Sequence, residues 1–306
     1  MKLSKKVFAV ISLCTLALCG CQAQKPTAPN PEDIIVTVGD IQIPYSLYKH
    51  YYQAALLQEN HEAGKGWSGE QLETLSLNTE ALILNDCVDR LIAEQQNVSL
   101  SEEELSAIAG QIHTAIQNKQ YPVGTDELLN FRFTSQALKE KTYTALYEPD
   151  FHQSAVHVQS LFLPYLNDTD EEKAGKDQLI TITGKLCSNE KDLSSLCDPL
   201  VSSYDAVLND IYLTNGDMGQ GVYELAATLE PYGASQAFTL GSDGVYLLQR
   251  LPVDEEYVNA NIGELLQNST EFSNLYRMFQ AATRKGTSIT YTEAKKQISP
   301  DILSDQ

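Results

Sequence analysis

Glycines at the corners of the stretch from Tyr212 to Arg250 restrict how this part of the chain can fold. These glycines are Gly216, Gly233, Gly241 and Gly244. A left-handed turn is cheap only for glycine, so each of them marks a change of chain direction. Between them the sequence predicts a strand at 211–213, a helix at 222–229 and a hairpin that ends in the alternating apolar run 245–248.

This order of elements resembles the second half of a parvulin-type prolyl isomerase domain. There the motif aromatic-F-T-x-G-x-M-x-x-x-F-E-x-A-A-F-x-L is followed by G-x-x-S and by G-Y-H with an apolar residue. The positions that fit are Thr214, Gly216, Met218, Ala226, Leu229, Gly233 and Gly244, and Glu224 lies one position after the motif's glutamate. Val222 stands where the family has the phenylalanine that walls the proline pocket, and Tyr246 follows Val245 where the family places histidine. The resemblance therefore indicates the fold more strongly than the catalytic activity.

The strand predicted at 155–163 opens the same domain. In the family this strand reads A-S-H-I-L-V, and its histidine faces the active site. The corresponding position here is Ser160 or Leu161, depending on a one-residue choice of register that stays open. His157 lies three or four residues too early, and we predict that it is an exposed residue at the start of the strand.

A helical half at 178–204 follows, in which Asp192-Leu193 and Ser203-Tyr204-Asp205 resemble the family's D-F-x-x-L-A-x-x-Y-S. Only six residues separate Asp205 from Tyr212. The family usually has a longer loop here, containing G-G-x-L-G, so the shortening removes another wall of the usual site.

An enzyme lowers the barrier to prolyl isomerisation, about 18–20 kcal/mol, by holding the proline ring and stabilising the twisted amide. The resemblance implies an apolar pocket for the ring. Its members here are Met218, Val222 and Leu229, with Ser160 or Leu161 from the first strand. Ordinary core packing is the alternative role for Met218.

The predicted site has fewer polar side chains than the family's site, where a histidine pair and a nearby cysteine or aspartate form a hydrogen-bond network. Tyr246 keeps a hydroxyl that can donate a hydrogen bond, and Asp205 can stand in for the acidic partner. With Met218 these residues form the predicted catalytic set. Because both histidines and the phenylalanine are replaced, we expect weak or absent isomerase activity.

The start of the chain is typical of a secretion signal rather than of a folded segment. Lys2, Lys5 and Lys6 precede an apolar stretch at 7–18, which is short for a membrane span. Leu18-Cys19-Gly20-Cys21 resembles the bacterial lipobox, so residues 1–20 are a predicted signal peptide and Cys21 a predicted lipidation site. This implies an extracytoplasmic protein, lipid-anchored to the bacterial cell membrane. An uncleaved anchor is the alternative, and it leaves the protein on the same side.

A polar, proline-rich tether at 21–33 leads into a hairpin at 34–43, a helix that Pro44 opens, and a long helix that ends near Gln96. Ser101 and Glu104 then form a predicted capping box. The hairpin, the helices and the string D-x-L-I-x-x-x-x-x-V-S-L-S-E-E-E-L at 89–105 resemble the N-terminal region of the extracytoplasmic foldases PrsA and SurA. Asn97 replaces a family glycine and suits the left-handed end of a helix.

Further helices are predicted at 104–118 and 126–147, and Pro149 is predicted to end the run. A long helix at 257–282 and a strand at 288–291 close the chain. Chains of the PrsA and SurA type end with a helix and strand that return to the N-terminal region. We therefore predict that Ile289 and Tyr291 pair alongside Val36 and Val38.

Together these resemblances imply an α+β fold: a helical SurA N-terminal-like chaperone domain, completed by the C-terminal helix and strand, with an inserted parvulin-like domain of a small antiparallel sheet and helices. The predicted ranges are 34–150 for the helical domain, 151–252 for the insertion and 253–306 for the C-terminal part. The length of 306 residues suits two domains or one domain with an insertion.

Composition excludes some partners and cofactors. The net charge of -20 argues against nucleic acid or an anionic lipid surface as partner, because no basic stripe is present to displace counterions. No Cys-x-x-Cys, His-Glu-x-x-His or histidine cluster occurs, so no metal site and no cofactor are predicted. Cys187 and Cys197 can form a disulfide in an oxidising compartment or remain an unpaired coincidence, and Cys87 is predicted to be a buried thiol.

The sequence thus predicts a membrane-anchored chaperone or foldase that binds unfolded secreted polypeptides, with a divergent isomerase domain. Aromatic side chains can supply apolar contact for such clients or simply fill the core; they are Tyr48, Tyr51, Tyr52, Phe131 and Phe133. Two alternatives stay open, an active prolyl isomerase and a non-catalytic solute-binding or scaffolding lipoprotein. The helix-rich N-terminal half argues against the repeated β-α units of a solute-binding protein.

Overall fold

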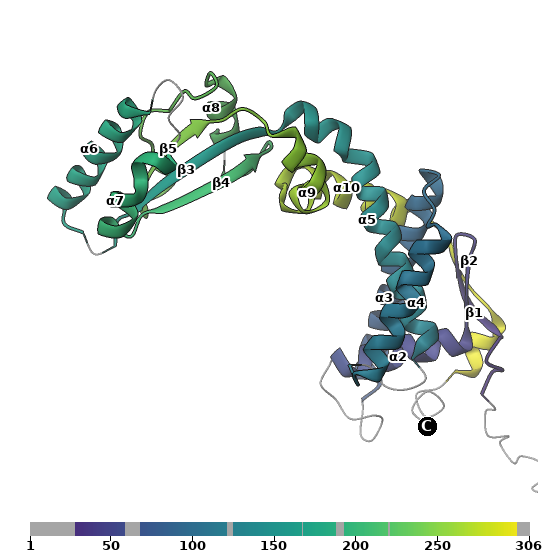
Figure 1. Cartoon of the computed structure of the whole chain (residues 1–306). Helices are drawn as coiled ribbons and strands as arrows, with labels where there is room; N and C mark the ends of the chain where they lie inside the picture. The colour runs from purple at the N-terminus through teal and green to yellow at the C-terminus, as the bar shows by residue number, and fades with distance from the viewer. Residues whose placement is uncertain are drawn as a thin grey trace, which may run out of the picture. The chain divides into compact units, whose positions relative to one another are not determined.

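The structure is a computed structural model that describes residues 28–58, 68–120, 125–166, 168–187, 193–219 and 221–298 (Figure 1). Cys21 and the predicted signal peptide lie outside the described residues. The described chain is α+β and mostly helical, and its strands form two three-stranded antiparallel sheets. It divides into two compact units. Unit 1 comprises the described residues within 1–87, 105–133 and 287–306, and unit 2 comprises those within 88–104 and 134–286.

Unit 1 joins the beginning and the end of the described chain in one sheet. Strand β1 (Ile34–Val38) lies between β2 (Ile41–Pro44) and β6 (Ile289–Tyr291). In the register of β1 with β6, Val36 is opposite Tyr291 and Val38 is opposite Ile289. The predicted return of the C-terminal strand to the N-terminal hairpin is therefore confirmed, and Figure 1 shows the yellow strand beside the purple one.

Helix α2 (Tyr45–Gln58) begins directly after Pro44, which is the last residue of β2 and not the first of the helix. Its tyrosines fill the core of unit 1: the exposed fractions of Tyr48, Tyr51 and Tyr52 are 1%, 0% and 5%. The Tyr51 hydroxyl donates to Asp86 Oδ2 at 2.5 Å, so even its polar end is bound inside. Of the two roles open for these aromatics, the tyrosines therefore have the core role.

Three long helices follow: α3 (Gly69–Gln95), α4 (Glu102–Gln117) and α5 (Asp126–Ser154). The start of α4 has the predicted capping box, since Glu104 N–H donates to Ser101 Oγ at 3.2 Å and Ser101 N–H to Glu104 Oε2 at 2.6 Å. Asn97 has a φ of 55°, the left-handed conformation expected at the end of α3.

Helix α5 passes through Pro149, so the prediction that this proline ends the helix is wrong. Proline inside a helix removes one backbone hydrogen bond and usually costs about 3 kcal/mol. Packing on both sides of Pro149 opposes that cost. The rings of Tyr147 and Phe151 lie 5.4 and 6.2 Å from the ring of Phe272, and Phe151 is 1% exposed.

The second sheet lies in unit 2 and has the strand order β4-β3-β5. The central strand β3 (Val156–Pro164) pairs antiparallel with β4 (Val207–Leu213) and with β5 (Gly244–Arg250). The predicted short connection between Asp205 and Tyr212 is thus mostly strand. Helices α6 (Asp170–Leu186) and α7 (Ser194–Tyr204) precede β4, and α8 (Val222–Thr228) precedes β5.

Each face of this sheet has its own apolar cluster. The α8 face carries Val156, Val158, Leu213, Val222, Ala226 and Leu248. The α6 face carries, among others, Leu161, Leu163, Ile180, Leu193, Val245 and Leu247. Side chains alternate between the two faces along each strand.

The long helix predicted at 257–282 is two helices, α9 (Glu255–Asn268) and α10 (Thr270–Gly286). Ser269 separates them with an extended backbone, φ -74° and ψ 123°. Its hydroxyl accepts from Phe272 N–H at 3.3 Å, a cap that begins α10. After β6, a short 3-10 helix, η1 (Glu293–Gln297), ends the described chain. Among the described residues, no helix is both long and apolar enough to cross a membrane.

Candidate functional site

The predicted isomerase site maps onto the α8 face, and β3 shows which of the two register choices belongs to it. Ser160 is opposite Leu248, a member of the α8 cluster, whereas Leu161 is opposite Leu247 on the α6 face. Directly opposed residues share one face of a sheet. The structure therefore brings Ser160, and not Leu161, to the side that carries Met218 and Val222.

The apolar part of this site is densely packed. Val222, at the position of the family's phenylalanine, is 2% exposed and belongs to the α8 cluster. Met218 and Leu229 are half-buried and pack against the same cluster. The three predicted pocket residues thus meet on one face, where they form continuous core.

Met218 has an unusual backbone for a side chain of its size. Its φ is 55°, and it lies between Gly216 and Gly219, whose φ values are 89° and 100°. Positive φ is uncommon outside glycine and costs about 1–3 kcal/mol where the surroundings impose it. The turn therefore holds the methionine against the α8 cluster at an energetic cost.

Asp217 imposes that turn, and its role was missed in the sequence. Its Oδ2 accepts from Thr214 N–H at 2.7 Å and from the Thr214 hydroxyl at 2.8 Å. Its Oδ1 accepts from Thr270 N–H at 2.8 Å, at the start of α10. The Thr214 hydroxyl also lies 2.6 Å from Ser269 Oγ. A Thr-x-x-Asp spacing beside Gly216 is the signal in the sequence, but the partners on α10 are more than fifty residues away.

Tyr246, a predicted site residue, is fixed by its neighbours. Its ring stacks on Phe162 at 4.5 Å and on Phe238 at 5.7 Å. Its backbone exchanges two hydrogen bonds with Phe238, at 2.7 and 3.1 Å. Gly244 permits this geometry, because a Cβ there would lie 2.3 Å from the Phe162 ring and 2.4 Å from Leu163 O.

Ser160 supplies a second hydroxyl on the same face. The residue is fully buried, and its Oγ has no hydrogen-bond partner among the described residues. A small hydroxyl here lacks the reach and the basicity of imidazole. Among the predicted site residues, the polar side-chain groups on this face are therefore the hydroxyls of Tyr246 and Ser160.

His157 is not an exposed strand-start residue as predicted. Its side chain is 12% exposed, with Nε2 2.5 Å from Asp210 Oδ1 and Nδ1 2.8 Å from Pro252 O. The ring also stacks on Tyr212, with centroids 4.4 Å apart. Both nitrogens face acceptors, and His157 lies on the α6 side of β3, so it cannot serve the α8 face.

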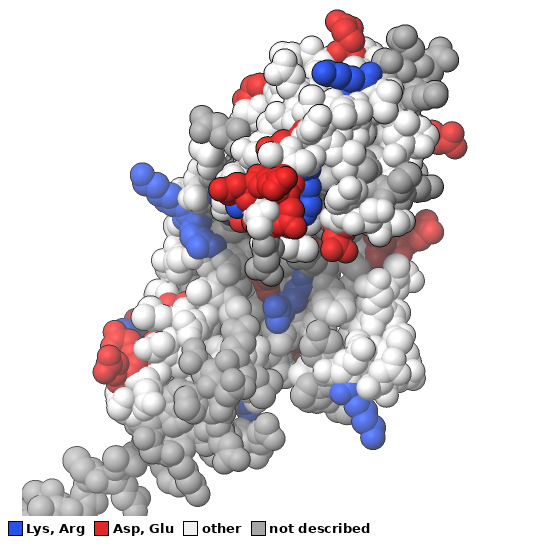
Figure 2. All heavy atoms as spheres, turned by 90° about the vertical axis from the view of Figure 1, so that its left-hand side faces the viewer, with Lys and Arg blue, Asp and Glu red and all other residues white. Residues whose placement is uncertain are grey.

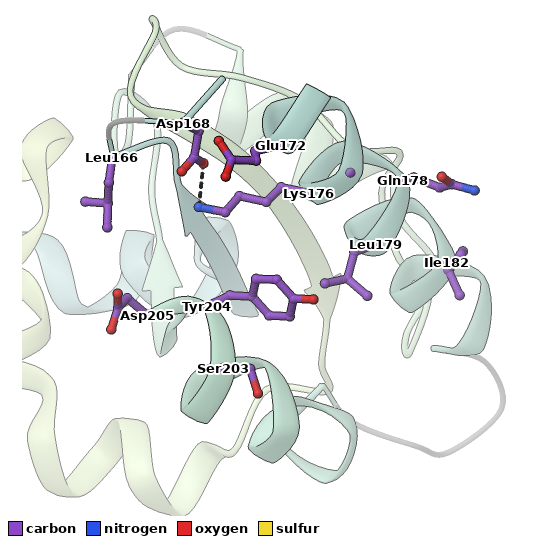
Figure 3. Close-up of a pocket in the computed structure, with 11 residues that line it drawn as sticks. Leu166, Asp168, Glu172, Lys176, Gln178, Leu179, Ile182, Ser203, Tyr204 and Asp205 are labelled. Atoms are coloured by element: carbon purple, nitrogen blue, oxygen red, sulfur yellow. Dashed lines mark ion pairs between the residues drawn. The ribbon is translucent and has the colours of Figure 1, made fainter. Parts of the chain in front are cut away.

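Asp205 does not join the other predicted catalytic residues. It follows α7 with a φ of 52° and lines a hollow between α6 and the end of α7, the α6 groove (Figure 3). The groove is lined by Leu166, Lys176, Ile182, Tyr204 and Asp205, among others. Asp205 therefore does not lie with Met218 and Tyr246 on the α8 face.

Cys187 and Cys197 are 4% and 1% exposed and belong to the same buried cluster on the α6 face. Their disulfide stays a prediction. Cys87 is buried, as predicted. Within the part of the chain that the structure describes, no group of three or more His, Cys, Asp or Glu residues is placed to hold a metal ion.

Comparisons with known proteins give a weak structural likeness. No protein-family model matches the sequence, and no curated protein matches it. One similar structure comes from a study of the virulence factor PEB4 and the periplasmic protein Cj1289, two SurA-like chaperones of Campylobacter jejuni. It is 11% identical, with a TM-score of 0.28, and the match covers 85% of this chain and 99% of that one.

A second similar structure is the foldase protein PrsA from Streptococcus pneumoniae. It is 15% identical, with a TM-score of 0.27, and the match covers 79% of this chain and 89% of that one. Because both TM-scores lie below 0.5, the functional conclusion rests on the residues and contacts of this chain.

Proposed function

We propose that this protein is an extracytoplasmic chaperone or foldase, anchored through a lipid on Cys21, that holds unfolded secreted polypeptides. In this proposal the insertion at 151–252 is a parvulin-like domain whose isomerase activity is weak or lost. Residues 34–150, with the C-terminal part at 253–306, form the helical chaperone-like domain, and the pairing of β6 with β1 supports the return of the C-terminal part to the N-terminal hairpin.

The observation that carries the proposal is the state of the α8 face. It keeps the frame that the resemblance implies, with Met218 and Val222 against the sheet, but it lacks imidazole at both expected positions. Ser160 is buried and Tyr246 is stacked between two phenylalanines. Packed core of this kind supports a folded scaffold better than a site that must admit and twist a proline.

Exposed apolar side chains on unit 2 support a holding role. Large apolar residues of the segment 166–207 face water: Leu166, Ile182, Leu186, Tyr204 and Val207 are 64%, 45%, 58%, 41% and 46% exposed. Apolar surface gathered in this way is typical of a site that binds other polypeptides.

The test compares holding with isomerisation, using the protein without residues 1–21. Aggregation of a chemically unfolded client is followed by light scattering, and cis-to-trans exchange of X-Pro peptides is followed in a protease-free assay. We expect suppressed aggregation while exchange keeps its uncatalysed time of about tens to hundreds of seconds.

Two outcomes contradict the proposal. Faster exchange that is lost in Met218→Ala or Tyr246→Phe identifies an active isomerase. No effect in either assay, with tight binding of one folded partner or one small solute, identifies a scaffolding or solute-binding lipoprotein.

A further inference from the structure

The α6 groove lies on the opposite face of the sheet from Met218 and Tyr246, and the predicted isomerase site does not use it. It is a hollow of about 630 Å³ between α6 and the end of α7. Figure 3 shows Lys176 and Tyr204 between a left-hand end with Leu166 and Asp205 and a right-hand end with Leu179 and Ile182. All of these residues belong to unit 2.

Large apolar side chains are exposed to solvent along the groove. Leu166, Ile182 and Tyr204 line it and are 64%, 45% and 41% exposed. Single exposed apolar residues are ordinary. Three in one hollow form an apolar surface, and covering it with another apolar group lowers the free energy.

The positive charge of the groove is already neutralised. Lys176 is the one cation among the described residues that line it, and it is 9% exposed. Its Nζ lies 2.6 Å from Asp168 Oδ2 and donates to Pro164 O at 2.6 Å. Figure 3 shows the ammonium turned toward Asp168. The lysine therefore has little charge left to offer a ligand.

Two further carboxylates, those of Glu172 and Asp205, line the groove. Glu172 accepts from Thr169 N–H at 2.7 Å, and this hydrogen bond lowers the pKa of Glu172, so it is ionised at neutral pH. Asp205 has no ion pair among the described residues that surround it. Lys173 is turned to Asp170, 4.0 Å away, and does not line the groove.

Acidic side chains also gather near the groove. Figure 2 faces the end of unit 2 on which α6 and α7 lie in Figure 1, and there Asp and Glu side chains gather in one compact group. The first turn of α6 contributes Asp170, Glu171 and Glu172 to this end of the molecule.

We propose that the α6 groove binds an extended segment of an unfolded polypeptide in which an apolar side chain stands beside Lys or Arg. Apolar side chains of the segment pack along the groove against Leu166, Tyr204 and Ile182, and its cations face Glu172 and Asp205. This inference rests on the proposed chaperone function and names its substrate class. Because the apolar area is small and the carboxylates are exposed to solvent, binding is weak and reversible, as release of a folding client requires.

The test measures binding of short fluorescein-labelled peptides by fluorescence anisotropy, with the protein lacking residues 1–21. One peptide has leucines between lysines, a second has glutamates in place of the lysines, and a third has serines in place of the leucines. We expect the first to bind most tightly and to weaken as salt is raised from about 0.1 M to 1 M, where the screening length falls from about 10 to 3 Å.

The key variant is Glu172→Gln with Asp205→Asn, which removes both charges and keeps the local structure. Glutamine still accepts in a capping box, and asparagine tolerates the left-handed backbone of position 205. We expect the lysine peptide to lose about fivefold in affinity for each carboxylate removed, and the loss to vanish at high salt. Glu256→Gln with Glu264→Gln, on α9, is the matched control.

Removing apolar surface gives the second arm. Ile182→Ser with Tyr204→Ser should abolish binding of the lysine peptide, whereas Met278→Ser, at an α10 residue that is 69% exposed, should leave it unchanged. Circular dichroism of each variant confirms that it is folded.

The outcomes separate this inference from the proposed function. If the protein suppresses aggregation but both groove variants bind all peptides like wild type, the inference is wrong and the chaperone function stands. If wild type binds the lysine peptide and the groove variants do not, yet aggregation is never suppressed, the groove is confirmed and the chaperone function is wrong. Preference for the glutamate peptide overturns the inference outright.

Discussion

At the scale of single residues, Asp89 is a buried carboxyl whose charge works against folding. It is 8% exposed, and its Oδ1 accepts from the Tyr276 hydroxyl at 3.1 Å and from Gln280 Nε2 at 2.6 Å. Burial raises the pKa of Asp89 above the ordinary value of 3.8, although both hydrogen bonds oppose the shift.

We predict that Asp89→Asn raises the unfolding temperature at neutral pH, because the amide oxygen can accept the same two bonds without a buried charge. A raised pKa gives stability that is full below the unfolded pKa of about 3.9 and is lost as pH rises through the folded pKa. The difference between variant and wild type should therefore vanish in acid. Calorimetry at several pH values checks this, and an advantage that grows in acid contradicts it.

Side-chain contacts with neighbours in the sequence were predictable from local patterns, whereas the distant side-chain contacts of His157 were not. The capping box of Ser101 with Glu104 and the left-handed Asn97 depend on neighbours within one turn. The state of His157 depends on Asp210 and Pro252, which lie 53 and 95 positions away. A pattern within one strand cannot show such partners, so an exposed histidine was the natural but wrong prediction.

At the scale of elements, Gly244 sets how closely β5 can approach β3. We predict that Gly244→Ala lowers the free energy of unfolding by about 1–3 kcal/mol, the usual cost of overpacking. Its Cβ would lie 2.4 Å from Leu163 O, and a backbone oxygen in a strand cannot turn away. Urea unfolding measures the change.

Gly263→Ala is the matched control for this glycine replacement. Gly263 lies inside α9, and a Cβ there meets no atom within 4 Å. Alanine in an open helix position should add about 0.5–1 kcal/mol of stability. Equal effects of the two substitutions would contradict the role given to Gly244.

Element types were largely predictable from periodicity, whereas their ends were not. The helix predicted at 257–282 breaks at Ser269 because that hydroxyl caps α10 and lies 2.6 Å from the hydroxyl of Thr214. Helix α5 continues through Pro149 because Phe272 packs against Tyr147 and Phe151, which precede and follow the proline in the helix. In both places a tertiary contact outweighed the local rule. The α8 face shows the same limit. The choice between Ser160 and Leu161 needed the pairing of Ser160 with Leu248, which only the structure gives.

At the scale of the whole molecule, unit 1 needs the C-terminal segment to complete it. Gly39 N–H donates to Ser288 O at 2.9 Å, and Thr292 N–H to Ile35 O at 3.1 Å. Lys295 Nζ lies 2.5 Å from Glu80 Oε1 and 2.7 Å from the Tyr48 hydroxyl. Without these contacts β1 becomes an edge strand over an opened core.

We predict that truncation after Gly286 loosens unit 1 and leaves the sheet of unit 2 intact. In hydrogen exchange, amides of β1 and α2 should exchange at least about tenfold faster, which corresponds to a loss of about 1.4 kcal/mol of local stability, whereas amides of β3 keep their protection. Lys296→Ala is the control, because that exposed side chain pairs only with Glu293 among the described residues. If β1 keeps its protection in the truncated chain, the terminal strand is an attachment rather than a part of the unit. If β3 loses protection as well, the two units unfold as one.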